Sequence, residues 1–491
     1  MKLKTKILNL RAGRPVAILH KRTAEKLSVN IDDRITLSKN SKKVISIVDI
    51  ATGLLKRDEV ALSEEIVKSL KVKEGECVEI DIATHPESIY LIHKKLMCHP
   101  LSKEELDKII SDIVKNALTE PEIAYFVSAI YKCGMSMKET EYLIKAIVRS
   151  GKRIKLRGKV ADKHCVGGIA GNRTTPIVVS ICASAGLKIP KTSSRAITSA
   201  AGTADVIESI AKVEFTTRQI KRILKKTNAC MVWGGALGLT PADAKILQIE
   251  KLLNLDPEPQ LLASILSKKL AVDSEYVIID IPYGKSAKVS KNKATDLKKK
   301  FEKLGKKFKM KIKCILTDGS QPIGNGIGPV LEIRDILSIL RQDPERPLDL
   351  EKKSLMLAGE LLELTGRTKK GKGKELARKI LQSGRALEKF EQIIKAQKGS
   401  ISQSKLRLGE FSKKITCSKK GKISEIDNKK INLIGRIIGS PSDKSAGIYL
   451  HKHCGEKVKR GELLMTFYAE SGGKLKDAVK FYSKVRPLKI I

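Results

Sequence analysis

Two short stretches rich in glycine and hydroxyl-bearing residues decide how this chain is interpreted. They are Asp162-Lys163-His164-Cys165-Val166-Gly167-Gly168 and Ser193-Ser194-Arg195-Ala196-Ile197-Thr198-Ser199-Ala200-Ala201-Gly202-Thr203-Ala204-Asp205. Gly167 and Gly168 lack a Cβ, so the backbone can approach an anion closely, and Lys163 adds a positive charge. The hydroxyls and backbone N–H groups of the second stretch can donate hydrogen bonds to phosphate oxygens. Together the two stretches predict a phosphate site.

The segment between the two stretches supports this interpretation. Either stretch alone is weak evidence for a phosphate site, because glycine pairs and serine-rich turns more often serve only to reverse the chain direction. Residues 174–186 are apolar and end in glycine as a helix does, and residues 186–190 follow as a short strand. About one βαβ unit therefore separates the stretches, and we expect both loops to face one cleft.

Composition limits the class of protein. The 491 residues, of which 41% are hydrophobic, predict three or four domains with conventional cores. No apolar run reaches the ~18 residues of a membrane span, and the first ten residues lack the features of a signal peptide, so we expect a soluble cytoplasmic protein.

Nine cysteines without a Cys-x-x-Cys pair predict no disulfide framework and no zinc ribbon. Residues 451–454, His-Lys-His-Cys, are interpreted as a solvated turn, so no metal and no cofactor are expected.

The strong positive charge makes nucleic acid a candidate partner. Lysine and arginine number 96 against 54 acidic residues, which gives a net charge of +42. The densest run, residues 285–313, alternates lysines with apolar residues at helical spacing, which indicates a solvated helix face over a core. Aromatic residues make up only 4%, so stacking platforms for single strands are scarce. We therefore expect a small anionic substrate and neither a nucleic acid nor a membrane partner.

The patterning changes along the chain. Residues 1–84 alternate short apolar runs and predict a β-rich N-terminal domain. Three capping boxes then predict the starts of helices. Residues 277–281 and 312–316 are apolar runs of the kind that is buried in a parallel sheet. The paired residues of the boxes are Ser102 with Glu105, Thr119 with Glu122, and Ser136 with Glu139.

The two glycine- and hydroxyl-rich stretches resemble the thymidine phosphorylase and pyrimidine-nucleoside phosphorylase family. The pattern of that family runs Asp-Lys-His-Ser-Thr-Gly-Gly, then Ser-x-Arg, then Gly-Thr-x-Asp-x-x-Glu. The last element reads Gly202-Thr203-Ala204-Asp205-Val206-Ile207-Glu208 in this chain, and further matching motifs lie at residues 263–271, 317–324 and 443–450. The resemblance covers roughly residues 86–491. The extra N-terminal domain points to the archaeal AMP phosphorylase branch.

This resemblance, together with the patterning, predicts an α/β fold class. We expect a helical domain plus a large α/β domain with a central mixed sheet, flanked by a small β-rich N-terminal domain and an α+β C-terminal domain. The expected bounds are 1–84 for the N-terminal domain, 85–150 and 241–271 for the helical domain, 155–240 and 272–400 for the α/β phosphate-binding domain, and 401–491 for the C-terminal domain.

The resemblance also implies the binding residues. Inorganic phosphate is expected as co-substrate on Lys163, Ser193 and Thr203. The nucleotide is expected on Gly168, Ser194, Arg195, Ala196, Ile197, Thr198, Ser199, Thr203, Ser264 and Lys288. Lys288 matches no cation of the nucleoside enzymes, so it is expected to serve the 5′-phosphate. The roles of His164 and Lys268 stay open.

The resemblance assigns the catalytic acid to Asp256, which aligns with the proton donor of AMP phosphorylases. It lies in Leu255-Asp256-Pro257-Glu258-Pro259, and we expect apolar neighbours to keep its carboxyl protonated. The alternative is an aspartate that caps a helix or a turn before proline.

Two positions depart from the pattern of the pyrimidine enzymes. Cys165 replaces a serine, and because a thiol is a poor donor the loop backbone has to carry more of the phosphate contact. Ile249 occupies the position of the arginine that contacts the base carbonyl, so that pyrimidine recognition is not preserved. A nucleophilic role of Cys165 is disfavoured, because phosphate is itself the nucleophile.

The expected activity is phosphorolysis of AMP, and also of CMP and UMP, to the free base and ribose 1,5-bisphosphate by a homodimer or higher homo-oligomer. The alternative in the same family is a thymidine or pyrimidine-nucleoside phosphorylase. A third alternative, from another class, is a basic RNA-binding protein.

Overall fold

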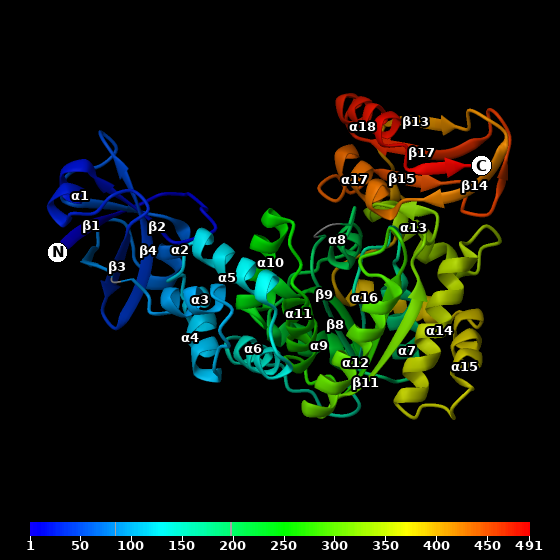
Figure 1. The fold of residues 1–491 in the computed structure, drawn as a ribbon, viewed down its shortest axis with the longest axis horizontal. Helices are drawn as coiled ribbons and strands as arrows, with labels where there is room; N and C mark the ends of the chain where they lie inside the picture. The colour runs from blue at the N-terminus through cyan, green and yellow to red at the C-terminus, as the bar shows by residue number, and fades with distance from the viewer. Residues whose placement is uncertain (84, 197–198) are drawn as a thin grey trace. The chain divides into compact units, whose positions relative to one another are not determined.

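The structure is a computed structural model that describes every residue except 84, 197 and 198 (Figure 1). The chain divides into two compact units. The first contains residues 1–150 and 241–263, and the second contains residues 151–240 and 264–491. Among the described residues, none of the helices combines the length and the apolar character that crossing a bilayer requires.

The first strands of the chain close into a barrel in the order β1-β5-β2-β4-β3-β6. Along β6, Val78 and Ile80 are buried, whereas the residues beside them are exposed. Successive side chains of a strand point to opposite faces, so this alternation fills the barrel with apolar groups. The elements are β1 (Lys2–Ile7), β2 (Val16–His20), α1 (Lys21–Leu27), β3 (Arg34–Lys39), β4 (Lys42–Ala51), β5 (Glu59–Leu62), α2 (Glu64–Leu70) and β6 (Cys77–Ile82).

The rest of the first unit is helical, and the three predicted capping boxes are confirmed. The carboxylates of Glu105, Glu122 and Glu139 each accept the N–H of the capping residue, at 2.7, 2.7 and 2.8 Å. The helices are α3 (Ser88–Leu96), α4 (Lys103–Val114), α5 (Glu120–Cys133), α6 (Met137–Arg149), α10 (Pro241–Leu253) and α11 (Glu258–Leu270). Helix α11 begins in the first unit and ends in the second.

One expectation about the cysteines is wrong. Cys98, which follows α3, and Cys133, the last residue of α5, form a disulfide bond. Their separation of 35 residues gave no signal, because the pairing depends on how the two helices lie side by side. The other seven cysteines are free.

The α/β part of the second unit is built on parallel strands, and the mixed sheet that was expected there is therefore wrong. Strands β11, β10 and β7 pair in that order, β8 pairs with β9, and a parallel bridge from Val160 to Lys188 joins the start of β7 to the start of β8. Helical crossovers connect these strands, and such crossovers return the chain to the same end of the sheet. The strands are β7 (Ala161–Cys165), β8 (Ile189–Ser193), β9 (Ala229–Trp233), β10 (Tyr276–Tyr283) and β11 (Lys311–Asp318).

The two predicted buried strands differ in their environment. β10 is buried along its length, as expected, whereas β11 lies at the sheet edge and only Cys314 and Thr317 are buried. The lysine-rich run forms a helix with a buried stripe that includes Leu297 and Phe301, as expected. The helices of this part are α7 (Thr174–Ser184), α8 (Thr203–Glu208), α9 (Thr217–Thr227), α12 (Lys291–Lys307), α13 (Pro329–Arg341), α14 (Leu348–Leu364), α15 (Gly373–Gln382) and α16 (Arg385–Ala396), with the 3₁₀ turn η1 (Gly234–Leu237).

The C-terminal region combines two small sheets with two helices. The four-stranded sheet has the order β12-β15-β17-β13, so it takes one strand from well before residue 401. The elements are β12 (Gly326–Ile327), η2 (Gln403–Leu406), β13 (Phe411–Thr416), β14 (Gly421–Ile426), α17 (Asn428–Ile438), β15 (Gly447–Leu450), β16 (Lys457–Val458), β17 (Leu463–Ala469), α18 (Gly472–Val485) and β18 (Leu488–Ile490).

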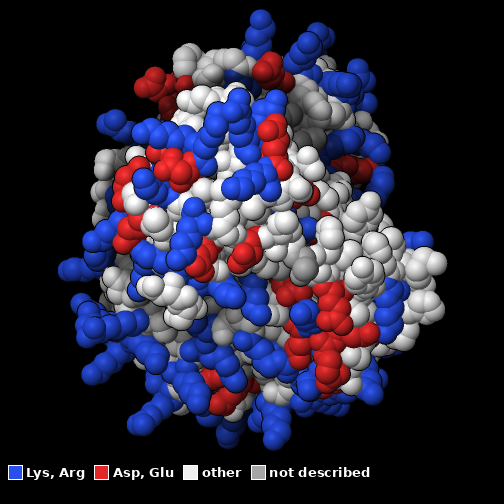
Figure 2. Space-filling model, turned by 90° about the vertical axis from the view of Figure 1, so that its left-hand side faces the viewer, with Lys and Arg blue, Asp and Glu red and all other residues white. Residues whose placement is uncertain are grey.

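Basic side chains are spread across the face that Figure 2 shows. Lysines and arginines cover much of that face, and groups of aspartates and glutamates lie between them. A spread of this kind differs from the continuous basic stripe that is typical of a nucleic-acid groove.

A buried aspartate holds the turn that leads into β12. Asp335 of α13 is 4% exposed, and its carboxylate accepts the N–H groups of Asn325 and Gly326 at 2.8 Å each. Burial raises the pKa of Asp335 to about 7. In the unfolded chain the same carboxyl titrates near 3.8.

We predict that Asp335 makes the second unit less stable as the pH rises. Between these two pKa values the folded state holds a proton that the unfolded state has released, so stability from this group is present at low pH and is lost as the pH passes about 7. Asp335→Asn removes the titration. The difference in free energy of unfolding in urea, Asp335→Asn minus wild type, should therefore increase by about 3 kcal/mol from about pH 5 to about pH 8. Asp477→Asn, at an exposed position of α18, is the control, and parallel pH profiles for Asp335→Asn and wild type would contradict the prediction.

Candidate active site

Both sequence stretches follow the carboxyl ends of neighbouring parallel strands. The first loop, residues 166–173, leaves β7, and the second loop, residues 194–202, leaves β8. The N–H of Ala161 donates to the carbonyl of Lys188 at 2.8 Å, which aligns the two strands. The carboxyl ends of parallel strands meet at one edge of a sheet, where ligands of α/β proteins bind. The structure therefore brings both loops to one edge of the sheet, and the cleft that they were expected to face stays a prediction.

The glycines of the first loop are required by its geometry. Gly167 and Gly168 have φ values of +91° and +92°, which side chains rarely tolerate. A Cβ on Gly168 would lie 2.9 Å from both the backbone nitrogen and the Cβ of Lys288. The first loop therefore packs directly on the segment that carries Lys288, so the structure brings these two predicted nucleotide contacts together.

Lys163 of β7 is buried, and its ammonium lies against the first residues of α7. Its ammonium donates to the hydroxyls of Thr174 and Thr175, at 2.7 and 3.4 Å. Burial lowers the pKa of Lys163, and the carboxylate of Asp280 counteracts this effect. An ammonium that faces hydroxyls at a helix N-terminus forms a setting that favours an anion. The two threonines were not predicted, because the sequence placed them only inside an apolar helix.

Asp162 connects three elements below the first loop. Its carboxylate pairs with Lys269 of α11 and lies 3.5 Å from the ammonium of Lys191 on β8. Lys191 also donates to the carbonyl of Lys163 at 2.9 Å. All four side chains are almost fully buried, and burial lowers the pKa of Lys269 to about 7. Lys191 and Lys269 were missed, because a lysine in a chain with this many lysines carries no local signal.

The neighbouring His164 and Cys165 are both uncharged groups. Burial lowers the pKa of His164 well below its usual value, and nearby lysines lower it further. Burial raises the pKa of the Cys165 thiol, whose sulfur accepts from the N–H of Gly167 and the amide of Asn172, at 3.4 and 3.3 Å. A thiol with a raised pKa holds little of the nucleophilic thiolate form at neutral pH. The Nδ1 atom of His164 is buried and has no hydrogen-bond partner among the described residues.

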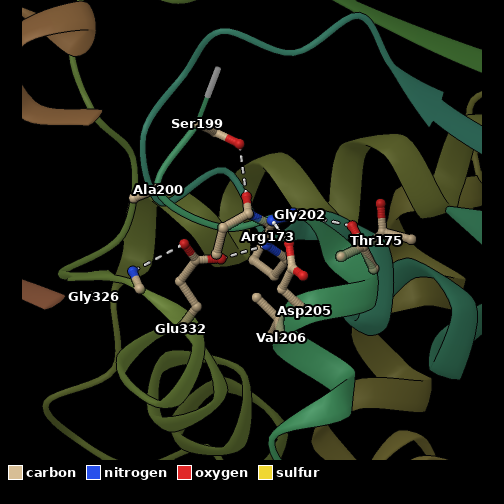
Figure 3. A network of polar contacts seen from close by, with 12 residues as sticks. Arg173, Thr175, Ser199, Ala200, Gly202, Asp205, Val206, Gly326 and Glu332 are labelled. Atoms are coloured by element: carbon tan, nitrogen blue, oxygen red, sulfur yellow. Dashed lines mark hydrogen bonds and ion pairs between the residues drawn. The ribbon is translucent and has the colours of Figure 1, made fainter. Parts of the chain in front are cut away.

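Arg173, the last residue of the first loop, bonds to the second loop and to α8, which follows it (Figure 3). Its guanidinium pairs with Glu332 of α13 and donates to the hydroxyl of Thr203 at 3.0 Å and to the carbonyl of Ala201 at 2.8 Å. The hydroxyl of Ser199 donates to the same carbonyl at 2.8 Å. Two predicted contacts, Thr203 and Ser199, therefore already take part in the internal bonding of this loop.

Asp205 shapes the same loop from α8. Its carboxylate accepts the N–H groups of Ala196 and Gly202 at 2.7 and 2.9 Å. The hydroxyl of Ser193, at the end of β8, is buried and has no hydrogen-bond partner among the described residues. An unpaired buried hydroxyl at this edge suits a polar ligand. Ser194 follows in the loop, and the predicted contacts Ile197 and Thr198 lie outside the described residues.

The positive charge of Arg195 is compensated by acidic side chains of the protein. Its guanidinium lies 2.6 Å from each oxygen of Glu208 and 3.4 Å from the carboxylates of Asp205 and Glu214, and it stacks 4.7 Å from the ring centroid of Trp233. The bonds to Glu208 raise the pKa of Arg195. This guanidinium orders the loop, which leaves the backbone of residue 195 as the part suited to contact a ligand.

The remaining predicted residues lie on or before α11. The ammonium of Lys268 donates to the hydroxyl of Ser264, one turn earlier, at 2.7 Å. Asp256 precedes the helix, and its side chain is exposed, so the apolar enclosure that was expected to keep it protonated is not found. Ile249 is buried on α10. Asp256 and Ile249 belong to the first unit, whereas Ser264, Lys268 and the two loops belong to the second.

The possible metal ligands near the C-terminus have other partners. The Nε2 atom of His451 lies 2.9 Å from the hydroxyl of Thr466, and that of His453 lies 3.1 Å from the amide oxygen of Asn325. Within the described residues, no group of three or more His, Cys, Asp or Glu side chains is arranged to hold a metal ion.

Comparisons with known proteins agree with this architecture. Residues 89–151 match the helical bundle domain of the glycosyl transferase family, residues 157–387 match the a/b domain of that family, and residues 422–488 match the pyrimidine nucleoside phosphorylase C-terminal domain. Among solved structures, anthranilate phosphoribosyltransferase from Thermus thermophilus superposes with a TM-score of 0.53 at 16% identity, covering 63% of this chain and 99% of that chain. At that identity the likeness concerns the fold alone.

Sequence relatives extend over nearly the whole chain. The AMP phosphorylase of Methanocaldococcus jannaschii is 44% identical over 93% of this chain and 92% of its own length, and that of Pyrococcus horikoshii is 44% identical over 100% and 98%. A protein of Legionella pneumophila whose name, thymidine phosphorylase, is provisional is 42% identical over 91% of this chain and 87% of its own length. With both loops at one sheet edge and relatives at this level of identity, the chain belongs to the thymidine and pyrimidine-nucleoside phosphorylase family of pentosyltransferases, in its AMP phosphorylase branch.

Proposed function

We propose that this chain is an AMP phosphorylase. It would convert AMP and inorganic phosphate to adenine and ribose 1,5-bisphosphate, and it would also accept CMP and UMP. The observation that carries the proposal is the meeting of the two loops at the carboxyl ends of β7 and β8, beside the buried ammonium of Lys163. The names and full-length similarity of the archaeal relatives support the same reaction.

The phosphate nucleophile would occupy the edge of the sheet between the two loops. Lys163 and the hydroxyls of Ser193 and Thr203 are proposed as its contacts. The ammonium of Lys163 already faces hydroxyls, and Ser193 has an unpaired buried hydroxyl. An anion there would supply the negative charge that a buried ammonium needs.

The nucleotide would occupy the surface of the same loops. Its 5′-phosphate would contact Lys288, whose backbone packs on Gly168. The proposed nucleotide contacts are Gly168, Ser194, Arg195, Ala196, Ser199, Thr203, Ser264 and Lys288, together with Ile197 and Thr198. The contribution of Arg195 would come from its backbone, because its guanidinium pairs with Glu208.

In the proposed reaction a phosphate oxygen attacks C1′ as the bond from C1′ to the base nitrogen breaks. The ribose carbon passes through oxocarbenium character, and the electron pair of the broken bond goes to the base. Asp256 would donate the proton that neutralises the leaving base.

The organisation around this reaction is part of the proposal. We propose the domain bounds 1–84, 85–150 with 241–271, 155–240 with 272–400, and 401–491, a cytoplasmic location, and a homodimer or higher homo-oligomer. The reaction as written needs no cofactor. The alternative within the family is a nucleoside phosphorylase. It is considered because the Legionella relative, whose provisional name is thymidine phosphorylase, is 42% identical to this chain.

We predict that the substrate must carry a 5′-phosphate. Base release should be rapid with AMP and at least about a hundredfold slower in kcat/KM with adenosine, because loss of the second anion removes charge-assisted contacts. The measurement compares AMP, CMP, UMP, adenosine and thymidine at one phosphate concentration. Equal rates with adenosine and AMP, or preference for thymidine, would move the protein to the nucleoside branch.

Lys288→Ala should raise the KM for AMP about tenfold and leave the KM for phosphate nearly unchanged. The reason is that the charge-assisted contact is lost at only one of the two anions. Lys285→Ala is the matched control, because Lys285 lies in the same segment and its exposed ammonium pairs with Glu425 at 3.0 Å. Equal changes for AMP and phosphate would place Lys288 outside the 5′-phosphate site.

Asp256→Asn should lower kcat by about 10²- to 10⁴-fold while AMP binding changes little. Asparagine keeps the size and polarity of the side chain but cannot transfer a proton. The control is Glu258→Gln, which removes a carboxylate from the first turn of α11, the helix that Asp256 precedes. A nearly wild-type rate for Asp256→Asn would assign this aspartate to the turn alone, because asparagine caps a turn almost equally well.

A further inference from the structure

One helix of the C-terminal region bonds to both loops of the candidate active site. The amide oxygen of Asn428 accepts the N–H of Ala170 in the first loop at 3.1 Å. The amide oxygen of Asn432 accepts the N–H of Ala200 in the second loop, also at 3.1 Å. Both asparagines lie on α17, four residues apart, and they are 0% and 4% exposed.

The contact is a packed interface and not a pair of isolated bonds. Ala170 and Ala200, each 1% exposed, belong to the hydrophobic core of the C-terminal region. A Cβ added to Gly435 of α17 would lie 2.8 Å from the Cβ of Ala200, so this position has no room for a side chain. Asn428, Asn432 and Gly435 follow the spacing i, i+4, i+7 and therefore share one helix face.

Asn428 also reaches the segment that carries Lys288. Its side-chain amide donates to the hydroxyl of Ser286 and to the carbonyl of Gly319, both at 3.1 Å. The backbone N–H of Asn428 donates to the same hydroxyl at 3.1 Å. One buried side chain thus connects the first loop, the segment around Ser286 and the segment around Gly319.

These bonds satisfy groups that have no access to water. The N–H groups of Ala170 and Ala200 are buried, and a buried donor without a partner is costly. Residues four apart on a helix are separated by about 6 Å along its axis, and the helix is rigid on that scale. Two loops bonded to such a pair cannot change their separation independently.

We propose that α17 positions the active site, with Asn428 and Asn432 as the residues that set the distance between the two loops. They act through the loops and do not contact substrate themselves. The consequence for the reaction rests on the proposed function, because the first loop and Lys163 would hold phosphate while the second loop would hold the nucleotide. A fixed separation then holds the phosphate nucleophile at attacking distance from C1′.

The direct test is amide hydrogen exchange of the full-length, substrate-free protein, followed in peptides that contain Ala170 or Ala200. Asn432→Ala should speed exchange roughly tenfold in the second loop and leave the first loop unchanged, because only one amide loses its acceptor. Asn428→Ala should have the reverse pattern and should also affect the segment around Ser286. Asn432→Asp keeps an acceptor oxygen, so protection of the second loop should be retained.

Two control variants separate positioning from general loss of stability. Lys429→Ala changes an exposed residue of the same helix, and Ile431→Val removes a methyl group from the core that contains Ala170 and Ala200. Ile431→Val should affect both loops alike or neither. If both alanine variants also affect the two loops alike, or change no exchange, the positioning role is overturned.

Kinetics supply the second readout. With AMP and phosphate, Asn428→Ala and Asn432→Ala should lower kcat by roughly tenfold or more well below the unfolding temperature, whereas Ile431→Val should retain the wild-type kcat. Wild-type kcat in both alanine variants would overturn the proposed link to the reaction. If the wild-type protein does not cleave AMP, the proposed function fails, while the exchange pattern still decides whether α17 holds the loops.

Discussion

The buried carboxylate of Asp162 is the interaction on which the candidate active site depends. It compensates two ammonium groups that are themselves buried, those of Lys269 on α11 and Lys191 on β8. Removal of one member of such a group leaves an uncompensated charge in the interior, which costs about 3–5 kcal/mol. Because Lys191 also donates to the carbonyl of Lys163, the network ties the middle of β7 to the middle of β8, two residues before each strand ends.

The cations around the loops divide into two kinds according to their partners. Arg173 and Arg195 pair with Glu332 and Glu208, so their charges are compensated within the protein and order the second loop. Lys163 instead donates to hydroxyls, and burial lowers its pKa. A cation of this second kind gains most from an arriving anion. This division is the reason for proposing Lys163, and neither arginine side chain, as a contact of phosphate.

The C-terminal region takes part in the same construction. Its core includes Ala170 and Ala200, which are loop residues far away in the sequence, and α17 supplies acceptors for their N–H groups. The turn before β12 is held by Asp335 of α13, and β12 then joins the C-terminal sheet. Active-site loops and C-terminal core are therefore one packed body, and a substitution far from the sheet edge can act on both.

The sequence by itself determined those features that depend on neighbours along the chain. The capping boxes, the buried stripe of α12, the strand at residues 277–281 and the position of both loops follow from local spacing, and the motif match identified the family. Only the tertiary structure decided which strands pair in parallel, that Cys98 and Cys133 form a disulfide bond, and that Asp256 is exposed. It also decided which buried polar residues lie behind the loops, namely Lys191, Lys269, Asn428 and Asn432. Pairing and burial depend on residues that are distant in sequence, and a single lysine or asparagine has no periodicity that reveals its partner.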